Sequence, residues 1–118
     1  MSIAVKRVYE KAAPSDGRRI LVDGLWPRGF KKSQLKVDRW LREIAPSAEL
    51  RKWYGHRPER WQEFRQRYRR ELEAAPRKEM VEDLARLVRR GKVTLVFAAK
   101  DVERCNAAVL EEVVSAAL

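Results

Sequence analysis

The sequence predicts an α/β fold in which a small, mainly parallel β-sheet is covered by helices, within a single domain of residues 1–118. Residues 93–99 (VTLVFAA) are almost continuously apolar, as in strands covered on both faces, and residues 20–25 begin with a second apolar run. Helical patterns fill the chain between the two runs, which favours parallel strands joined by a right-handed crossover. With 45% hydrophobic residues, the 118-residue chain can bury one compact core.

The N-terminal third is predicted to hold two strands and a helix. A short strand over residues 3–9 is followed by a loop over residues 10–18, whose proline, serine and glycine make it the expected mobile loop. After the strand that ends near Leu25, apolar residues at helical spacing predict a core-facing helix that stops at Pro46. The face of that helix comprises Val37, Trp40, Leu41 and Ile44.

Three further helices are predicted before the second central strand. Ser47 can cap a short helix that Gly55 ends. Pro58 suits the first position of a long helix that ends before Pro76, and the next helix stops at Gly91. The buried stripes of the two long helices comprise Trp61, Phe64, Tyr68 and Leu72 in the first, and Met80, Leu84, Leu87 and Val88 in the second.

Polar side chains follow both central strands and predict a crevice. Asp101 can cap a last helix that follows residues 93–99. Because parallel strands end at the same edge of a sheet, where open α/β proteins bind ligands, the side chains after the two strands should meet there. They comprise Asp23, Trp26, Arg28, Lys100, Asp101, Cys105 and Asn106.

Each of these side chains also has a structural interpretation. Asp23 with Arg28 could form a buried ion pair or hold a ligand, because a buried carboxylate needs a partner in either case. Trp26 suits a core or pocket wall better than base stacking. Opposite charges at Lys100 and Asp101, directly after a buried strand, favour a functional site, although Asp101 also suits a helix cap.

His56 and Cys105 are the remaining candidates for chemistry. His56 lies in a turn between helices, where it could act as a general acid or base or be a hydrogen-bonded turn residue. Cys105, near a helix start and beside Arg104, could have a lowered pKa and act as a nucleophile. One cysteine and one histidine are too few for a usual zinc site, so no metal is predicted, and no sequence motif indicates a cofactor.

A formal net charge of +10 and a pI near 10.3 indicate a field that attracts phosphates and other anions. Much of this charge lies within residues 57–70, on both flanks of a predicted helix. Glu63, Arg67 and Glu71 have i, i+4 spacing, which favours a solvated, ion-paired face over a stripe that binds nucleic acid.

Four segments together resemble the YeaO-like family of small bacterial proteins, the domain of unknown function 488. They are LVDGLWPRG, LREIAPSAELRKWYGH, RWQEFRQRYRREL and VTLVFAAKDVERCNAAVL, and they cover essentially the whole chain. The resemblance implies an α/β fold with a polar pocket, and distant members imply that the first strand is parallel, whereas its short connection favours an antiparallel one. It implies site roles for Asp23, Trp26, Pro27, Arg28, Arg51, Trp53, His56, Lys100, Asp101 and Asn106.

The chain departs from this resemblance at two places. Gly24 stands where the family usually has an arginine, and Arg104 and Cys105 stand where it usually has a histidine and an asparagine. The missing cation weakens the expectation that every ligand contact of the family is kept, although Arg104 or another arginine could substitute.

Two functional hypotheses follow. In the favoured one, an anionic, nucleotide-like small molecule is bound between Arg28, Arg51 and Lys100 by a binder or small enzyme. Asp23 or Asp101 would then accept a proton, and His56 could donate one; Trp26, Trp53 and Asn106 would contact the ligand. In the alternative, a basic surface grips nucleic acid without chemistry. No apolar stretch is long enough to cross a bilayer and no signal peptide is evident, so a cytoplasmic protein without membrane contact is expected.

Overall fold

The computed structural model describes residues 2–118 and contains one four-stranded, all-parallel sheet. Its strands are β1 (Ser2–Arg7), β2 (Arg18–Leu21), β3 (Arg39–Trp40) and β4 (Lys92–Phe97), in the order β1-β4-β2-β3. The two central strands are adjacent and parallel, as predicted, with Ile20 opposite Leu95. β1 is also parallel to β4, which settles the orientation that the sequence left open.

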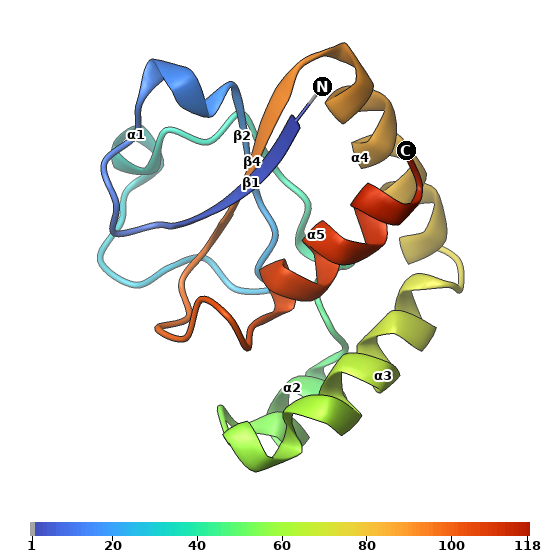
Figure 1. Cartoon of the computed structure of the whole chain (residues 1–118). Helices are drawn as coiled ribbons and strands as arrows, with labels where there is room; N and C mark the ends of the chain where they lie inside the picture. Colours follow the sequence, from blue (N-terminus) through green and yellow to red (C-terminus); the bar gives the residue numbers. More distant parts are fainter. Residues whose placement is uncertain (1) are drawn as a thin grey trace.

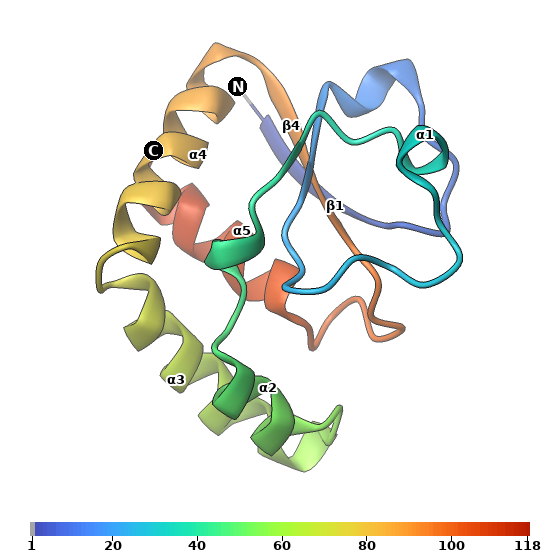
Figure 2. The same cartoon turned by 180° about the vertical axis from the view of Figure 1, so that it is seen from behind.

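Residues 2–118 also contain five α-helices, and the α/β class is therefore confirmed. Helices α4 (Arg77–Arg90) and α5 (Asn106–Ala116) lie along one face, and the short α1 (Lys32–Leu35) lies on the opposite side (Figures 1 and 2). Helices α2 (Ala48–Tyr54) and α3 (Trp61–Leu72) form a hairpin beyond the start of α5 (Figure 1). Short 3₁₀ turns precede β2, α2 and α3, at Pro14–Asp16, Arg42–Ile44 and Pro58–Arg60.

The core is divided by the sheet into a large and a small cluster, because successive side chains of a strand point to opposite faces. Ile20 of β2 and Leu95 of β4 belong to the large cluster, with the apolar faces of α3, α4 and α5. Leu21 and Val96 belong to the small cluster, with Leu35 of α1. Both central strands are therefore covered on both faces, as their continuous apolar sequences predicted.

The predicted helix over residues 37–44 is wrong. The segment instead contains the edge strand β3 and a 3₁₀ turn. Its backbone is held by the sheet, since the N–H of Asp38 donates to the carbonyl of Arg19 and the N–H of Leu41 to that of Leu21. The strand bonds replace the helical ones that the spacing of apolar residues suggested.

The predicted caps of the helical hairpin are confirmed. The Ser47 hydroxyl accepts a hydrogen bond from the Leu50 N–H at 3.2 Å, and Gly55 ends α2 in the left-handed conformation. Asp101, in contrast, does not cap α5, whose N-cap is Cys105. Trp61, predicted to be buried with Phe64 and Tyr68, is only half-buried.

The end of the loop before β2 is anchored on the sheet. Asp16 is buried there and accepts bonds from the Arg19 guanidinium at 2.7 Å and from Lys6 at 3.0 Å. The next residue, Gly17, has φ of +65°, and a Cβ at this position would collide with the backbone carbonyl of Lys92. Only glycine therefore allows the chain to enter β2 this close to the start of β4.

A cavity at the carboxyl ends of β2 and β4

A cavity of about 770 Å³ opens where the two central strands end. Its walls come from the segments that follow β1, β2 and β4, and from α2 and the turn after it. Of the ten residues to which the resemblance gives site roles, nine line it: Asp23, Trp26, Pro27, Arg28, Arg51, His56, Lys100, Asp101 and Asn106. The remaining one, Trp53, lies elsewhere.

Asp23 joins the two strands at this cavity. One carboxylate oxygen accepts a bond from the Ala98 N–H at 2.9 Å, and the other accepts one from the Asn106 side-chain amide at 3.1 Å. The same amide also donates to the carbonyl of Val22 at 3.2 Å. These bonds fix the carboxylate between β2, β4 and the first residue of α5.

Asp23 is not neutralised by direct contact with a cation. Among the described residues it has no ion pair, so the buried Asp23–Arg28 pair considered from the sequence does not form. Burial raises the pKa of this carboxyl above its ordinary value of 3.8, and it outweighs the two hydrogen bonds and the nearby charges of Arg51 and His56, which lower it. A carboxyl with a raised pKa in a cavity can exchange a proton with a bound molecule.

The rim of the cavity carries basic side chains that have no ion-pair partner in the described part of the protein. Arg28, Arg51 and Lys100 are exposed, and within residues 2–118 none of them makes an ion pair or a side-chain hydrogen bond. Arg104 also lines the cavity but pairs with Asp101 at 3.4 Å. The lining thus holds more basic than acidic side chains, which favours anions.

Asp101 organises the turn between β4 and α5. One of its oxygens accepts bonds from the backbone N–H groups of Glu103 and Arg104, each at 3.0 Å. Desolvation acts to raise the pKa of Asp101, but these bonds and Arg104 outweigh it and lower the pKa below 3.8. The Tyr54 hydroxyl holds the same turn by donating to the carbonyl of Arg104 at 2.9 Å. Asp101 is therefore a turn-forming carboxylate at the cavity wall.

Cys105 lacks the lowered pKa that its position near the start of α5 suggested. Its side chain is buried, and its thiol lies 3.7 Å from the carbonyl oxygen of Val102. Burial raises the pKa of the thiol to about 11, so it is protonated at neutral pH. His56, in contrast, is exposed at the cavity. It follows Gly55, and both residues have positive φ (57° and 52°), which turns the chain back towards α3.

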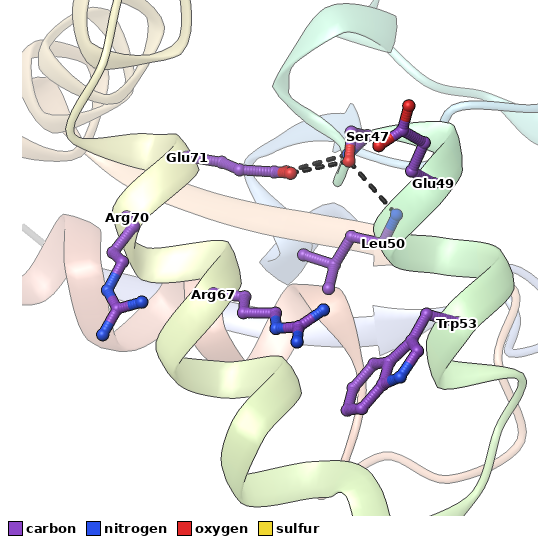
Figure 3. A pocket seen from close by; sticks show the side chains of 7 residues that line it. All are labelled: Ser47, Glu49, Leu50, Trp53, Arg67, Arg70 and Glu71. Carbon is purple, nitrogen blue, oxygen red and sulfur yellow. Dashed lines mark hydrogen bonds between the residues drawn. The ribbon is translucent and has the colours of Figure 1, made fainter.

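Trp53 lies on a second, smaller cavity of about 400 Å³ between α2 and α3 (Figure 3). Its ring is flanked by the guanidinium groups of Arg60 and Arg67, at 4.9 and 4.6 Å from the ring centroid. Above it, Glu71 accepts bonds from the N–H and hydroxyl of Ser47, which ties α3 to the start of α2 (Figure 3). In this position Trp53 stabilises the helical hairpin.

Tyr9 is an exposed aromatic residue of the lining that the sequence did not point to. Its ring is 57% exposed at the cavity and lies 4.8 Å from the Arg7 guanidinium carbon and 5.5 Å from the Phe30 ring. Arg7 is itself fixed, because it donates to the carbonyls of Ala99 and Ala98. The only signal for Tyr9 was its place at the end of a third parallel strand, whose orientation the sequence left open.

Two classes of site are not found in the described part of the chain. No group of three or more histidine, cysteine, aspartate or glutamate side chains among residues 2–118 is arranged to hold a metal ion. No helix described there is long and apolar enough to cross a membrane.

The fold and the cavity define a small α/β protein with a cavity at the carboxyl ends of its central strands. Residues 2–118 match the family model described as the inactive DUF488-N3 subclade, and the chain belongs to this family. It is 43% identical over 112 residues to the uncharacterized protein YeaO of Escherichia coli, covering 95% of this chain and 96% of that protein. It is also 43% identical over 113 residues to the uncharacterized protein Rv3073c of Mycobacterium tuberculosis, with 96% and 93% covered. No solved structure gives a significant match.

Proposed function

We propose that this protein binds a small anionic molecule in the strand-end cavity. The observation that carries the proposal is the set of three exposed cations, Arg28, Arg51 and Lys100, which reach one cavity from three separate segments without any ion-pair partner among the described residues. Charged side chains that line a concave site and lack a protein partner are suited to pair with the charge of a ligand.

Binding without turnover fits the site better than catalysis. The family to which the chain belongs is described as inactive. The cysteine in the cavity wall has a raised pKa near 11 and is buried, so it lacks the thiolate that a nucleophile needs. Asp23, Asp101 and His56 retain the chemistry to move protons, and in this proposal they orient the ligand instead.

The alternative, a surface that grips nucleic acid, has less support. Arg65 and Arg69 of α3 both pair with Glu112 of α5, and Arg67 pairs with Glu63. Much of the positive charge on this helix is thus already matched by protein carboxylates. Only the Arg67–Glu63 pair has the i, i+4 spacing that the sequence suggested, whereas Glu71 bonds Ser47 instead of Arg67. A continuous phosphate-binding stripe needs free cations instead.

Isothermal titration calorimetry with pyrophosphate tests the proposal. Arg28→Ala and Lys100→Ala should each weaken binding by about tenfold or more, since a charge-assisted hydrogen bond contributes about 1.5 to 3 kcal/mol. Arg70→Ala is the matched control, because Arg70 is an exposed arginine on α3 outside the strand-end cavity. Unchanged pyrophosphate binding in both cavity variants, together with a large loss of affinity for a short DNA duplex in Arg70→Ala, would favour the nucleic-acid alternative.

A further inference from the structure

The strand-end cavity contains a carboxylate as well as cations, and an anion alone does not explain both. Asp23 lies in the wall between the segments after β2 and β4 and would repel a phosphate placed against it. Each of its two oxygens accepts one bond from the protein, from Ala98 and from Asn106. An ionised carboxylate has about four acceptor positions, so both oxygens can accept a further bond from a ligand.

The cavity also offers a fixed aromatic surface. The ring of Tyr9 is 57% exposed, although a large ring is usually covered, and the Arg7 guanidinium lies against it. Arg7 is held by the carbonyls of Ala98 and Ala99, directly after β4, so the ring that packs on it lies beside the strand ends. Such a ring can stack on a planar group, as aromatic side chains do on nucleic acid bases.

We propose that the ligand is a purine nucleoside phosphate whose base carries a pair of adjacent N–H donors, as guanine does. Asp23 receives the donor pair with its two oxygens, Tyr9 stacks on the base, and Arg28 with Lys100 holds the phosphate. The cavity of about 770 Å³ is of the size that encloses ligands of this kind. This inference rests on the proposed function and adds the recognition of the base.

A ligand series on the unmodified protein tests the inference without any variant. The probes are guanosine, inosine and adenosine 5′-monophosphate and ribose 5-phosphate, compared by calorimetry in one buffer. Inosine lacks the second donor, and adenine presents an acceptor where guanine presents the ring N–H. A site that expects a donor and finds none is left with unpaired polar groups. We expect the guanosine compound to bind at least about tenfold more tightly than the adenosine compound and ribose 5-phosphate, with inosine between.

Asp23→Asn adds a test in which two affinities move in opposite directions. The substitution should lower the affinity for guanosine 5′-monophosphate by about tenfold or more, because the amide replaces one acceptor by a donor. It should leave ribose 5-phosphate binding unchanged or tighter, because a negative charge near the phosphate is removed. Tyr9→Leu should lower the affinity for the three nucleotides but not for ribose 5-phosphate. Tyr9→Phe is the control, because it keeps the ring. Circular dichroism establishes that each variant is folded.

The outcomes separate this inference from the proposed function. Equal affinities for the guanosine compound, the adenosine compound and ribose 5-phosphate overturn the base recognition, while binding that still depends on Arg28 supports the anion site. Ribose 5-phosphate binding that is insensitive to Arg28→Ala and Lys100→Ala overturns the anion site. If none of the probes binds, both proposals are wrong.

Discussion

Asp16 and Asp23 are two buried or half-buried aspartates whose pKa values move in opposite directions. Burial opposes the ionisation of Asp16, but the Ala13 N–H, Lys6 and Arg19 outweigh it and hold the pKa at about 2. Asp23 has no cation in contact among the described residues, so burial dominates and raises its pKa. The first carboxylate is satisfied within the protein, and the second is left with charge and acceptor capacity for another molecule.

The ion network at Asp16 predicts a specific acid sensitivity. Its pKa is lower in the folded protein than the ordinary 3.8, so it stabilises the native state above about pH 4 and this contribution is lost as the pH falls towards 2. Asp16→Asn should cost on the order of 3 kcal/mol at pH 7, because Arg19 would keep a buried charge without its partner. Urea unfolding of the unmodified protein and of Asp16→Asn, measured from pH 7 to pH 2, gives the pH dependence and the cost of the substitution. The free energies of unfolding of the two proteins should converge at the acid end. A constant difference across this range would contradict the assignment.

The strand-end residues could be predicted from the sequence because they follow the apolar runs of the two central strands. Asp23 and Lys100 follow apolar runs within a few residues, and parallel strands bring such positions together. Trp53 and Tyr9 could not be placed in this way. Which side of α2 faces the cavity depends on how the hairpin packs against α5, and Tyr9 enters the site only because β1 is parallel to β4.

At the scale of elements, residues 37–44 show how packing overrides periodicity. The apolar residues in this segment have helical spacing, yet the open edge of β2 offers backbone partners to Asp38 and Leu41. Trp40 then packs on the small cluster, and its indole N–H donates to the carbonyl of Asp23 at 2.7 Å. The pattern in the sequence is local, whereas the competing hydrogen bonds come from residues about twenty positions away.

The aromatic stripe of α3 predicts a graded response to truncation. Phe64 is buried and stacks on Tyr54 at 4.4 Å between ring centroids, whereas Trp61 is half-buried at the margin of the same cluster. Phe64→Ala should cost about 3 to 5 kcal/mol, and Trp61→Ala should cost less despite the larger side chain. Chemical denaturation of the two variants checks this order. The reverse order would place Trp61 at the centre of the hairpin's packing.

For the molecule as a whole, the strand order predicts where the native state opens last. β4 is bonded to β1 on one side and β2 on the other, and its residues from Val93 to Phe97 are buried. β3 has only two residues and a single neighbour. Native-state hydrogen exchange should therefore be slowest for β4 amides and much faster at β3. Equal protection at β3 would indicate that the edge strand belongs to the most stable unit of the fold.

The contact between Gly17 and Lys92, at the start of β2, also affects the position of residues at the other end of the strand. The segment from Arg18 to Leu21 acts as a short rigid spacer, with the glycine contact at one end and Asp23 just beyond the other. A side chain at position 17 would push the start of β2 away from Lys92, and the displacement would be carried along the strand to the bond between Asp23 and Ala98. The geometry of the cavity thus depends partly on a contact at the amino ends of the strands, between residues that do not line the cavity.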